Sequence, residues 1–302
     1  MHLLIVTLLV QCYMPFIWKI TALKRYDSRV ILLINYVVTV VLSAIVAVKQ
    51  NLFSVLTYLP EARLPTLMTE KTMGNTAWIL VFVGIAAGIV YYLSLFLSQK
   101  NISVNGMGIS SFFSQAGLVG SLMVAFVFFD EAITAFQWFS IAGILLSILL
   151  LTSDSKKIKI KSPVLLVAVC LGNMAVGASN KFYAKYAIES YKTAFLTVAF
   201  LFAFLTASAK ILWDLRSGRQ ALRSGKAELF CGITLGSANL LYSYLNLKCL
   251  ESLPAAIVVP TLSAGGLIVS TLLAVLLFKE PTSKRHIFAI GLSCIFIFLL
   301  NL

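Results

Sequence analysis

The amino-acid sequence predicts an all-α membrane protein whose ten transmembrane helices form two inverted five-helix repeats. Three observations predict this fold class. Of the 302 residues, 60% are apolar or aromatic and 12% are charged, and the mean hydropathy is +0.96. The apolar residues form long continuous runs, and the two halves of the chain repeat a pattern of polar residues. Because soluble domains carry about a quarter charged residues, the composition excludes a soluble enzyme, a secreted disulfide scaffold and a disordered chain.

Ten segments are apolar over about 20 residues, the length that a helix needs to cross the hydrocarbon of a bilayer. They are, in chain order, 3–22, 30–48, 76–98, 104–129, 133–152, 163–182, 192–212, 228–247, 253–278 and 286–302. The start of the chain lacks the basic residues of a signal peptide, so we expect the first segment to be a retained span. The multi-pass chain then belongs in a membrane, and we expect the bacterial cytoplasmic membrane.

Charged residues separate the segments. Lys24 and Arg25 follow the first segment, Lys49 follows the second, and Lys100 follows the third. The longest connection is 49–75, and no connection is long enough to hold a soluble domain. A basic excess in so apolar a chain is typical of cytoplasmic loops, not of nucleic-acid binding.

The two halves of the chain, 1–152 and 153–302, carry matching polar residues. An offset of 149 residues pairs Ser94 with Ser243, Ser114 with Ser263, Gly117 with Gly266, Ser121 with Ser270, and Phe128-Phe129-Asp130-Glu131 with Leu277-Phe278-Lys279-Glu280. Nearer the start of each half the offset is 162, which pairs Lys19 with Lys181, Asp27 with Glu189, and Ser28 with Ser190. The difference fits an insertion within the 49–75 connection.

An odd number of spans in each half determines how the halves relate. After five crossings the chain is on the opposite side of the membrane, so the second half inserts upside down. Inverted repeats of this kind are typical of secondary transporters, which bind their substrate near the middle of the bilayer.

The order of these motifs resembles the EamA-type units of the drug/metabolite transporter superfamily. In each half the resemblance rests on a lysine at the end of the first span, a short third-to-fourth connection and a fourth span rich in small residues. It also rests on a glutamate directly after that span, Glu131 or Glu280, and a glycine in the fifth span, Gly143 or Gly291. The resemblance covers nearly the whole chain and implies a ten-helix transporter of small metabolites.

Polar side chains inside the spans are the candidate substrate-binding residues, because a polar group in a membrane helix must find a partner. Many recur at spacings of three and seven residues, on one helical face, and the resembling family lines its cavity with the first, third, fourth, sixth and eighth spans. The candidates are Gln11, Trp18, Lys19, Tyr91, Tyr92, Gln115, Asn173, Asn180, Lys181, Asn239, Tyr242 and Asn246. The alternative is that they form hydrogen bonds between helices without touching a substrate.

All eleven carboxylates lie in connections or at span ends. This disfavours the exchange of cations for protons through an embedded glutamate, which small multidrug pumps of this superfamily use. Lys19 and Lys181 either extend to the membrane surface or attract an anionic or zwitterionic substrate. We expect Glu131 and Glu280 to have a structural role, capping the helix that follows each of them.

Other residues give little sign of chemistry. The five cysteines lie mostly in apolar runs without a CxxC pair, which favours packing over a disulfide or a metal site. With two histidines and dispersed carboxylates, the sequence predicts no catalytic set, no cofactor and no metal. Gly84xxxGly88 and Gly232xxxGly236 predict close helix packing, and Pro260 with Gly265-Gly266 predicts a bend in the ninth span.

The sequence therefore predicts a secondary transporter that moves a small polar metabolite by alternating access and needs no partner beyond the lipid bilayer. A monomer is sufficient for this. Two alternatives stay open, an integral-membrane enzyme acting on a lipid-linked or small substrate, and a non-transporting membrane subunit.

The distribution of basic residues predicts that both termini lie outside the cytoplasm. Seventeen of the 24 Lys and Arg residues lie in odd-numbered connections or at the span ends beside them, and seven lie in or beside even-numbered ones. Basic residues near span ends resist translocation, so the richer set is expected in the cytoplasm. The resemblance implies the opposite, since ten-helix relatives keep their termini inside.

Overall fold

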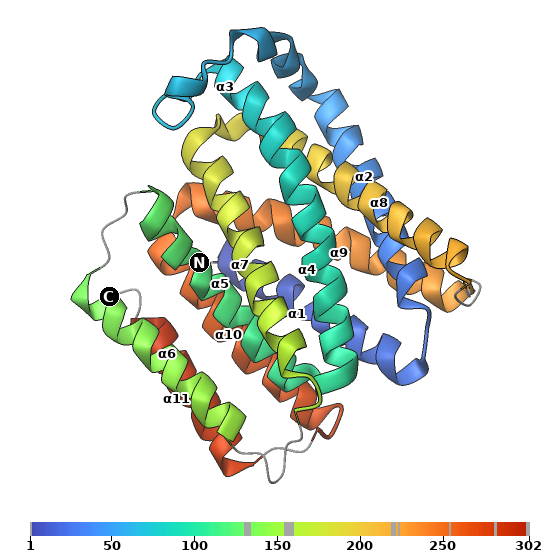
Figure 1. Ribbon diagram of the computed structural model, residues 1–302, viewed down its shortest axis with the longest axis vertical. Helices are drawn as coiled ribbons and strands as arrows, with labels where there is room; N and C mark the ends of the chain where they lie inside the picture. The colour runs from blue at the N-terminus through green and yellow to red at the C-terminus, as the bar shows by residue number, and fades with distance from the viewer. Residues whose placement is uncertain are drawn as a thin grey trace. The chain divides into compact units, whose positions relative to one another are not determined.

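The computed structural model describes residues 2–129, 134–153, 160–218, 222, 224–253, 255–280 and 283–299. Almost all of these residues are helical, and they contain no strand. The principal helices are α1 His2–Lys24, α2 Ser28–Lys49, α3 Met73–Trp78, α4 Gly84–Asn105, α5 Met107–Phe129, α6 Ala135–Ser153, α7 Pro163–Tyr186, α8 Lys192–Arg216, α9 Lys226–Ser252, α10 Ala255–Leu276 and α11 Lys284–Leu299 (Figure 1). The all-α prediction is confirmed for this part of the chain.

Five helical stretches among the described residues are long and apolar enough to cross a membrane. They are His2–Lys24, Ser28–Lys49, Met73–Asn105, Pro163–Tyr186 and Glu189–Arg216. The third stretch runs from α3 into α4 through one π-helical turn, Ile79–Val83. Large apolar side chains such as Val164 and Leu9 are 78% and 60% exposed, as expected for surfaces that face lipid. These features identify a multi-pass integral membrane protein.

The helices form two units, each built from both halves of the sequence. The first unit comprises residues 1–23, 97–178 and 252–302, and the second comprises 24–96 and 179–251. Helices α4 and α7 each contribute residues to both units. The predicted division into the halves 1–152 and 153–302 follows the order of the sequence. Each packing unit, in contrast, contains residues of both halves.

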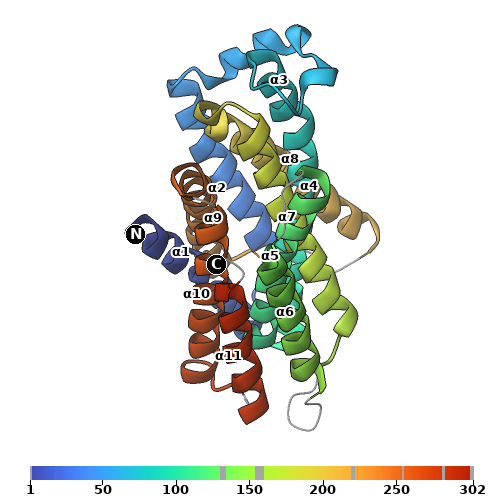
Figure 2. The same ribbon diagram turned by 90° about the vertical axis from the view of Figure 1, so that its left-hand side faces the viewer.

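Helices α5 and α10 pack against each other in the first unit and run antiparallel (Figure 1). Gln115, in the middle of α5, lies beside Gly266 of α10, while Met107 at the start of α5 lies beside Glu280, beyond the end of α10. Helix α6 packs along α11 in the same unit, and their ribbons lie side by side in two views (Figures 1 and 2). Phe139 of α6 and Phe296 of α11 meet edge to face there.

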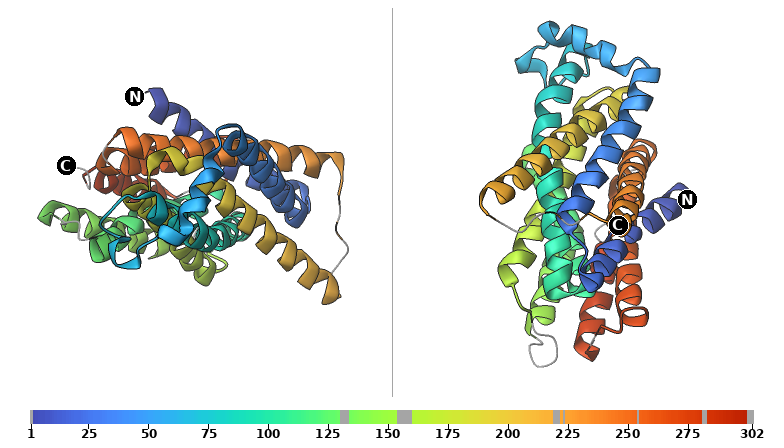
Figure 3. Two further views of the ribbon diagram at one scale, coloured as in Figure 1. Left: turned by 90° about the horizontal axis from the view of Figure 1, so that it is seen from above. Right: turned by 90° about the vertical axis from the view of Figure 1, so that its right-hand side faces the viewer.

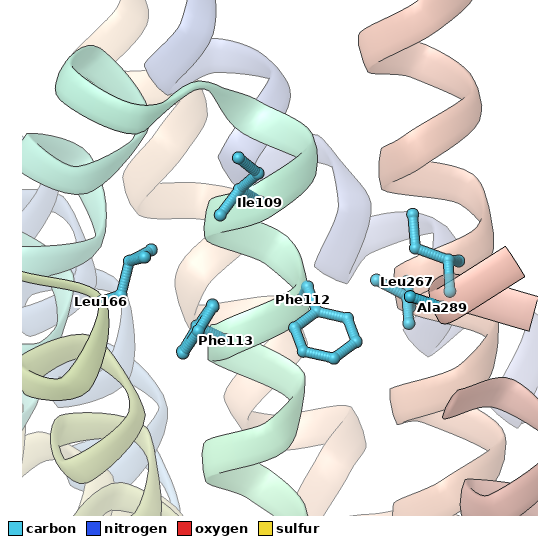
Figure 4. Close-up of a cluster of buried hydrophobic side chains, with 7 residues drawn as sticks. Ile109, Phe112, Phe113, Leu166, Leu267 and Ala289 are labelled. Carbon is cyan, nitrogen blue, oxygen red and sulfur yellow. The ribbon is translucent and has the colours of Figure 1, made fainter. Parts of the chain in front are cut away.

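A cluster of buried apolar side chains fills the space between four helices of the first unit (Figure 4). Ile109, Phe112 and Phe113 extend from α5 toward Leu166 of α7, and toward Leu267 of α10 and Ala289 of α11. Close packing of this kind fixes the position of α5, which carries Gln115 one turn further along the chain.

In the second unit α2 packs against α8, and glycines bring α4 and α9 close to this pair (Figure 3). A Cβ atom added to Gly88 of α4 would lie 2.7 Å from the Cβ of Phe202 in α8. A Cβ added to Gly236 of α9 would lie 2.7 Å from the carbonyl oxygen of Asn35 in α2. Both predicted Gly-xxx-Gly faces are therefore confirmed as close contacts.

The long 49–75 connection is folded, although its length alone suggests a loose loop. It contains the 3₁₀-helices Leu52–Glu61 and Leu64–Thr66. The buried Asn75 side chain accepts a hydrogen bond from the Arg63 amide at 3.0 Å and donates to the carbonyls of Thr66 and Glu70 at 3.1 and 3.0 Å. One buried amide thus holds three points of the connection together.

Candidate functional site

Lys19 near the end of α1 forms an ion pair with Glu280 at 2.5 Å, and both side chains are about 15% exposed. The same carboxylate accepts hydrogen bonds from the backbone amides of Met107 and Gly108 at 2.8 and 3.1 Å. These amides begin α5 and have no partner within the helix, so Glu280 caps α5. Lys19 also lies 6.0 Å above the ring centroid of Phe278.

Two left-handed residues place the Glu280 carboxylate at the start of α5. Lys279 has a φ of 50°, which ends α10 and turns the chain, and the Glu280 amide donates to the Ala274 carbonyl at 3.0 Å. Gly106 has a φ of 92° between α4 and α5, and a Cβ there would lie 3.1 Å from Glu280 Oε2. Glycine therefore satisfies both the turn and the close approach of the carboxylate.

The structure corrects the predicted role of Glu280. We expected this glutamate to cap the following helix, α11, but it caps α5, which lies about half the chain away in sequence. Lys19 was expected either to extend to the membrane surface or to attract an anionic or zwitterionic substrate, and both expectations stay predictions, while the structure pairs its ammonium group with Glu280. Glu131 and Asp130 lie outside the described residues.

Two of the cavity candidates, Gln11 and Gln115, come together in the first unit. Gln11 Nε2 donates to Gln115 Oε1 at 3.4 Å. Gly266 of α10 lies against both amides, since a Cβ added to it would be 2.7 Å from Gln115 Nε2 and 3.4 Å from Gln11 Nε2. The absence of a side chain at residue 266 leaves room for the two amide groups.

Several buried polar atoms near these residues have no hydrogen-bond partner within the described part of the chain. They include Gln11 Oε1, Trp18 Nε1 and the hydroxyls of Ser111 and Ser263. Trp18 is 1% exposed and Ser263 is fully buried. Because an unsatisfied polar group costs several kcal/mol in an apolar medium, these atoms are suited to a polar solute or to ordered water.

Tyr91 and Asn180 form the central contact of the second unit, where the Tyr91 hydroxyl donates to Asn180 Oδ1. Tyr36, which sequence reasoning overlooked, is fully buried and donates its hydroxyl to the Tyr91 carbonyl at 3.0 Å. Its ring lies 6.2 Å from that of Tyr92 and 6.5 Å from that of Phe200. These aromatic contacts hold Tyr91 and Tyr92 in place.

Asn239 of α9 donates to Asn35 Oδ1 of α2 at 3.3 Å. Asn35 is fully buried, and its Nδ2 atom has no partner. A polar residue in the middle of an apolar span was the signal that could have identified Asn35 from the sequence. The contact connects α2 with α9 at the place where Gly236 brings their backbones close.

The remaining candidates divide between the two units. Asn173 lies on α7 in the first unit, where its Nδ2 donates to the Val169 carbonyl of the same helix at 2.9 Å. Lys181, Tyr242 and Asn246 are half-buried residues of the second unit. The expectation that all twelve residues face one cavity stays a prediction.

No group of three or more His, Cys, Asp or Glu residues that could hold a metal ion occurs among the described residues. All five cysteines are free thiols, and three of them are buried.

No family model and no curated protein matches the chain. Twenty-three chains of solved structures are similar to it. One of them, described only as the crystal structure of a protein, is 15% identical with a TM-score of 0.54, and the similarity covers 97% of this chain and 96% of that chain. At this level of identity the likeness shows a shared fold over almost the whole length.

Proposed function

We propose that the chain is a secondary transporter of the drug/metabolite transporter type, with ten membrane spans in two inverted repeats. It moves a small polar metabolite across a bacterial cytoplasmic membrane by alternating between two conformations. The amides, hydroxyls and aromatic groups of its helices bind the solute, and no cofactor takes part.

One pair of contacts in the first unit carries this proposal. Gly117 of α5 lies against Asn173 of α7, since a Cβ added to the glycine would be 3.0 Å from the Asn173 Cβ. Gly266 of α10 lies against Gln11 of α1. The sequence offsets of 149 and 162 convert one contact into the other, because they relate Gly117 to Gly266 and Gln11 to Asn173. A repeated contact supports a repeated structure.

The packing of whole helices gives further support. The offsets make α2 the counterpart of α8, α5 the counterpart of α10, and α6 the counterpart of α11, and each of these helices packs against its own counterpart. Within each unit, the packing of a helix against its counterpart is the arrangement that a two-fold repeat produces. The antiparallel course of α5 and α10 is what an axis in the plane of the membrane requires, because it reverses the direction of each helix.

Such a repeat supports transport because it provides two conformations of similar energy, one open to each side of the membrane. A bound solute replaces water as the partner of the buried amides and hydroxyls. Weak neutral contacts suit a carrier, which must release what it binds.

Uptake by purified protein in liposomes tests the proposal against its alternatives. We expect saturable uptake of a small polar metabolite, accelerated when the liposomes are preloaded with the same unlabelled solute, because a carrier exchanges solute in both directions. Protein-free liposomes are the control. An enzyme would convert the solute to a product detected by mass spectrometry. With a non-transporting subunit, none of the metabolites tested would enter the liposomes, and that outcome would refute transport.

The orientation of the chain is a separate prediction. Because the odd-numbered connections hold most of the basic residues, we expect both termini outside the cytoplasm. A reporter that is active only in the cytoplasm, fused after Leu302, should then be silent. A second fusion within the basic stretch 156–161 should be active, and the reverse pattern would show that the charge distribution misleads.

A further inference from the structure

Ionisable side chains are scarce along three helices that meet in the first unit. The sequences of α5 and α10 contain no Asp, Glu, Lys, Arg or His, and between His2 and Lys24 the only charged residue of α1 is Lys19. A negative charge on a solute bound among these three helices would therefore have Lys19 as the only counter-charge that their sequences offer.

The charge of Lys19 is already neutralised. Its ammonium group lies 2.5 Å from the Glu280 carboxylate, which is fixed in turn by two backbone amides of α5. A bound anion that used the charge of Lys19 would have to displace that carboxylate, and one that did not would lie among helices without another cation. A bound cation would meet a carboxylate whose hydrogen bonds are already made.

Neutral hydrogen-bonding groups, in contrast, are unsatisfied in the same unit. Gln11 and Gln115 share one long hydrogen bond of 3.4 Å, and Gln11 Oε1 has no partner. The hydroxyls of Ser111 and Ser263, each about one turn from Gln115 or Gly266, also have none. Buried groups of this kind are stabilised by a ligand that donates and accepts hydrogen bonds without carrying charge.

The repeat places an amide at the related position of the other half. Asn173 lies against Gly117 as Gln11 lies against Gly266, so the two related positions both carry a neutral amide. We infer that the amides and hydroxyls of the first unit bind an uncharged solute bearing amide or hydroxyl groups, and that the Lys19–Glu280 pair excludes anions. The inference rests on the proposed transport function and narrows its substrate class.

Matched pairs of probes test the inference by equilibrium binding to the purified full-length protein in detergent. The pairs are nicotinamide and nicotinate, a hexose and the corresponding hexuronate, and glycerol and glycerol phosphate. In each pair the two members share a carbon skeleton, and one member is anionic at neutral pH. We expect at least one neutral member to bind. The dissociation constant of its charged partner should be at least about tenfold higher.

Variants assign the binding to the named residues. Ser263→Ala and Gln115→Leu should weaken binding of the neutral probe by up to about tenfold, the value of one lost hydrogen bond. Ser147→Ala is the matched control, because Ser147 is an equally buried serine of the first unit whose hydroxyl donates to the Gly143 carbonyl of its own helix.

Glu280→Gln removes the carboxylate that neutralises Lys19, so nicotinate should bind more tightly to this variant than to the unmodified protein. Lys19→Gln removes the cation, so this variant should not bind nicotinate more tightly than the unmodified protein does. Thermal unfolding of each variant shows whether it is folded.

Each result bears on the inference. The expected result is that neutral probes bind and anions do not. The loss of affinity for the neutral probe should be confined to the Ser263 and Gln115 variants. Anions bound equally or better, no probe bound at all, or equal losses in the Ser147 variant would overturn the inference. Neutral probes that bind but do not enter liposomes would leave this specificity intact and refute transport, so the two proposals fail separately.

Discussion

Replacing Glu280 with alanine is expected to lower the free energy of unfolding by up to about 3–5 kcal/mol, the effect of removing one partner from a buried ion pair. The change leaves Lys19 largely shielded from solvent without its partner, and it leaves the amides of Met107 and Gly108 without an acceptor. The midpoint of thermal unfolding in detergent measures the loss.

Two controls separate the ion pair from the helix cap. Lys19→Met should cost less than Glu280→Ala, because the carboxylate keeps its two amide donors. The double variant should lose less than the sum of the single ones, since the residues act on each other. Glu189→Ala breaks the exposed pair between Lys71 and Glu189, 3.8 Å apart, and should change stability by at most about 1 kcal/mol. A Glu280 effect no larger than the Glu189 effect would contradict the capping role.

Gly88→Ala is the second change for which we expect a large effect. The added Cβ would overlap the carbonyl oxygen of Ala199 and lie 2.7 Å from the Cβ of Phe202 and 3.0 Å from the amide of Ala203. Two of these neighbours are backbone atoms, so α4 and α8 must separate. Overpacking costs about 1–3 kcal/mol or more, which exceeds the gain of up to about 1 kcal/mol from the better helix propensity of alanine.

Gly291→Ala is the matched control, since a Cβ at this helical glycine would have no neighbour within 4 Å among the residues that the structure describes. It should leave thermal stability unchanged or raise it slightly, because only the propensity gain applies. Equal midpoints for the Gly88 and Gly291 variants would show that α4 and α8 are not in close contact.

The sequence was sufficient to predict features set by local composition. The helical bounds of α1 and α2, His2–Lys24 and Ser28–Lys49, differ from the predicted segments by one or two residues, because a change from apolar to charged residues marks each end. The apolar setting of Gln11 and Gln115 indicates that each side chain needs a polar partner, but it does not identify one as the partner of the other.

Contacts between distant segments were not predictable in the same way. Glu280 was recognised as a structural residue, but no local signal identifies α5 as the helix that it caps, because the partner amides lie 172 and 173 residues away. Likewise the halves of the sequence are not the units of packing, since α2 packs on α8, α5 on α10 and α6 on α11, and each of these pairs joins residues of both halves. Asn35 and Tyr36 were missed because the polar residues of the second span were not considered.

The folded 49–75 connection has a practical consequence for protein engineering. Experimenters usually choose the longest extramembrane segment for an epitope or a fluorescent protein. Here that segment is held by the Asn75 side chain, and next to it Lys71 Nζ donates to the Ala184 carbonyl and Thr76 Oγ1 accepts from the Ile188 amide. A tag inserted between Leu52 and Thr72 would separate these partners and disturb the start of α3 and the end of α7 together. The length of a connection is therefore a poor guide to where this chain tolerates an insertion.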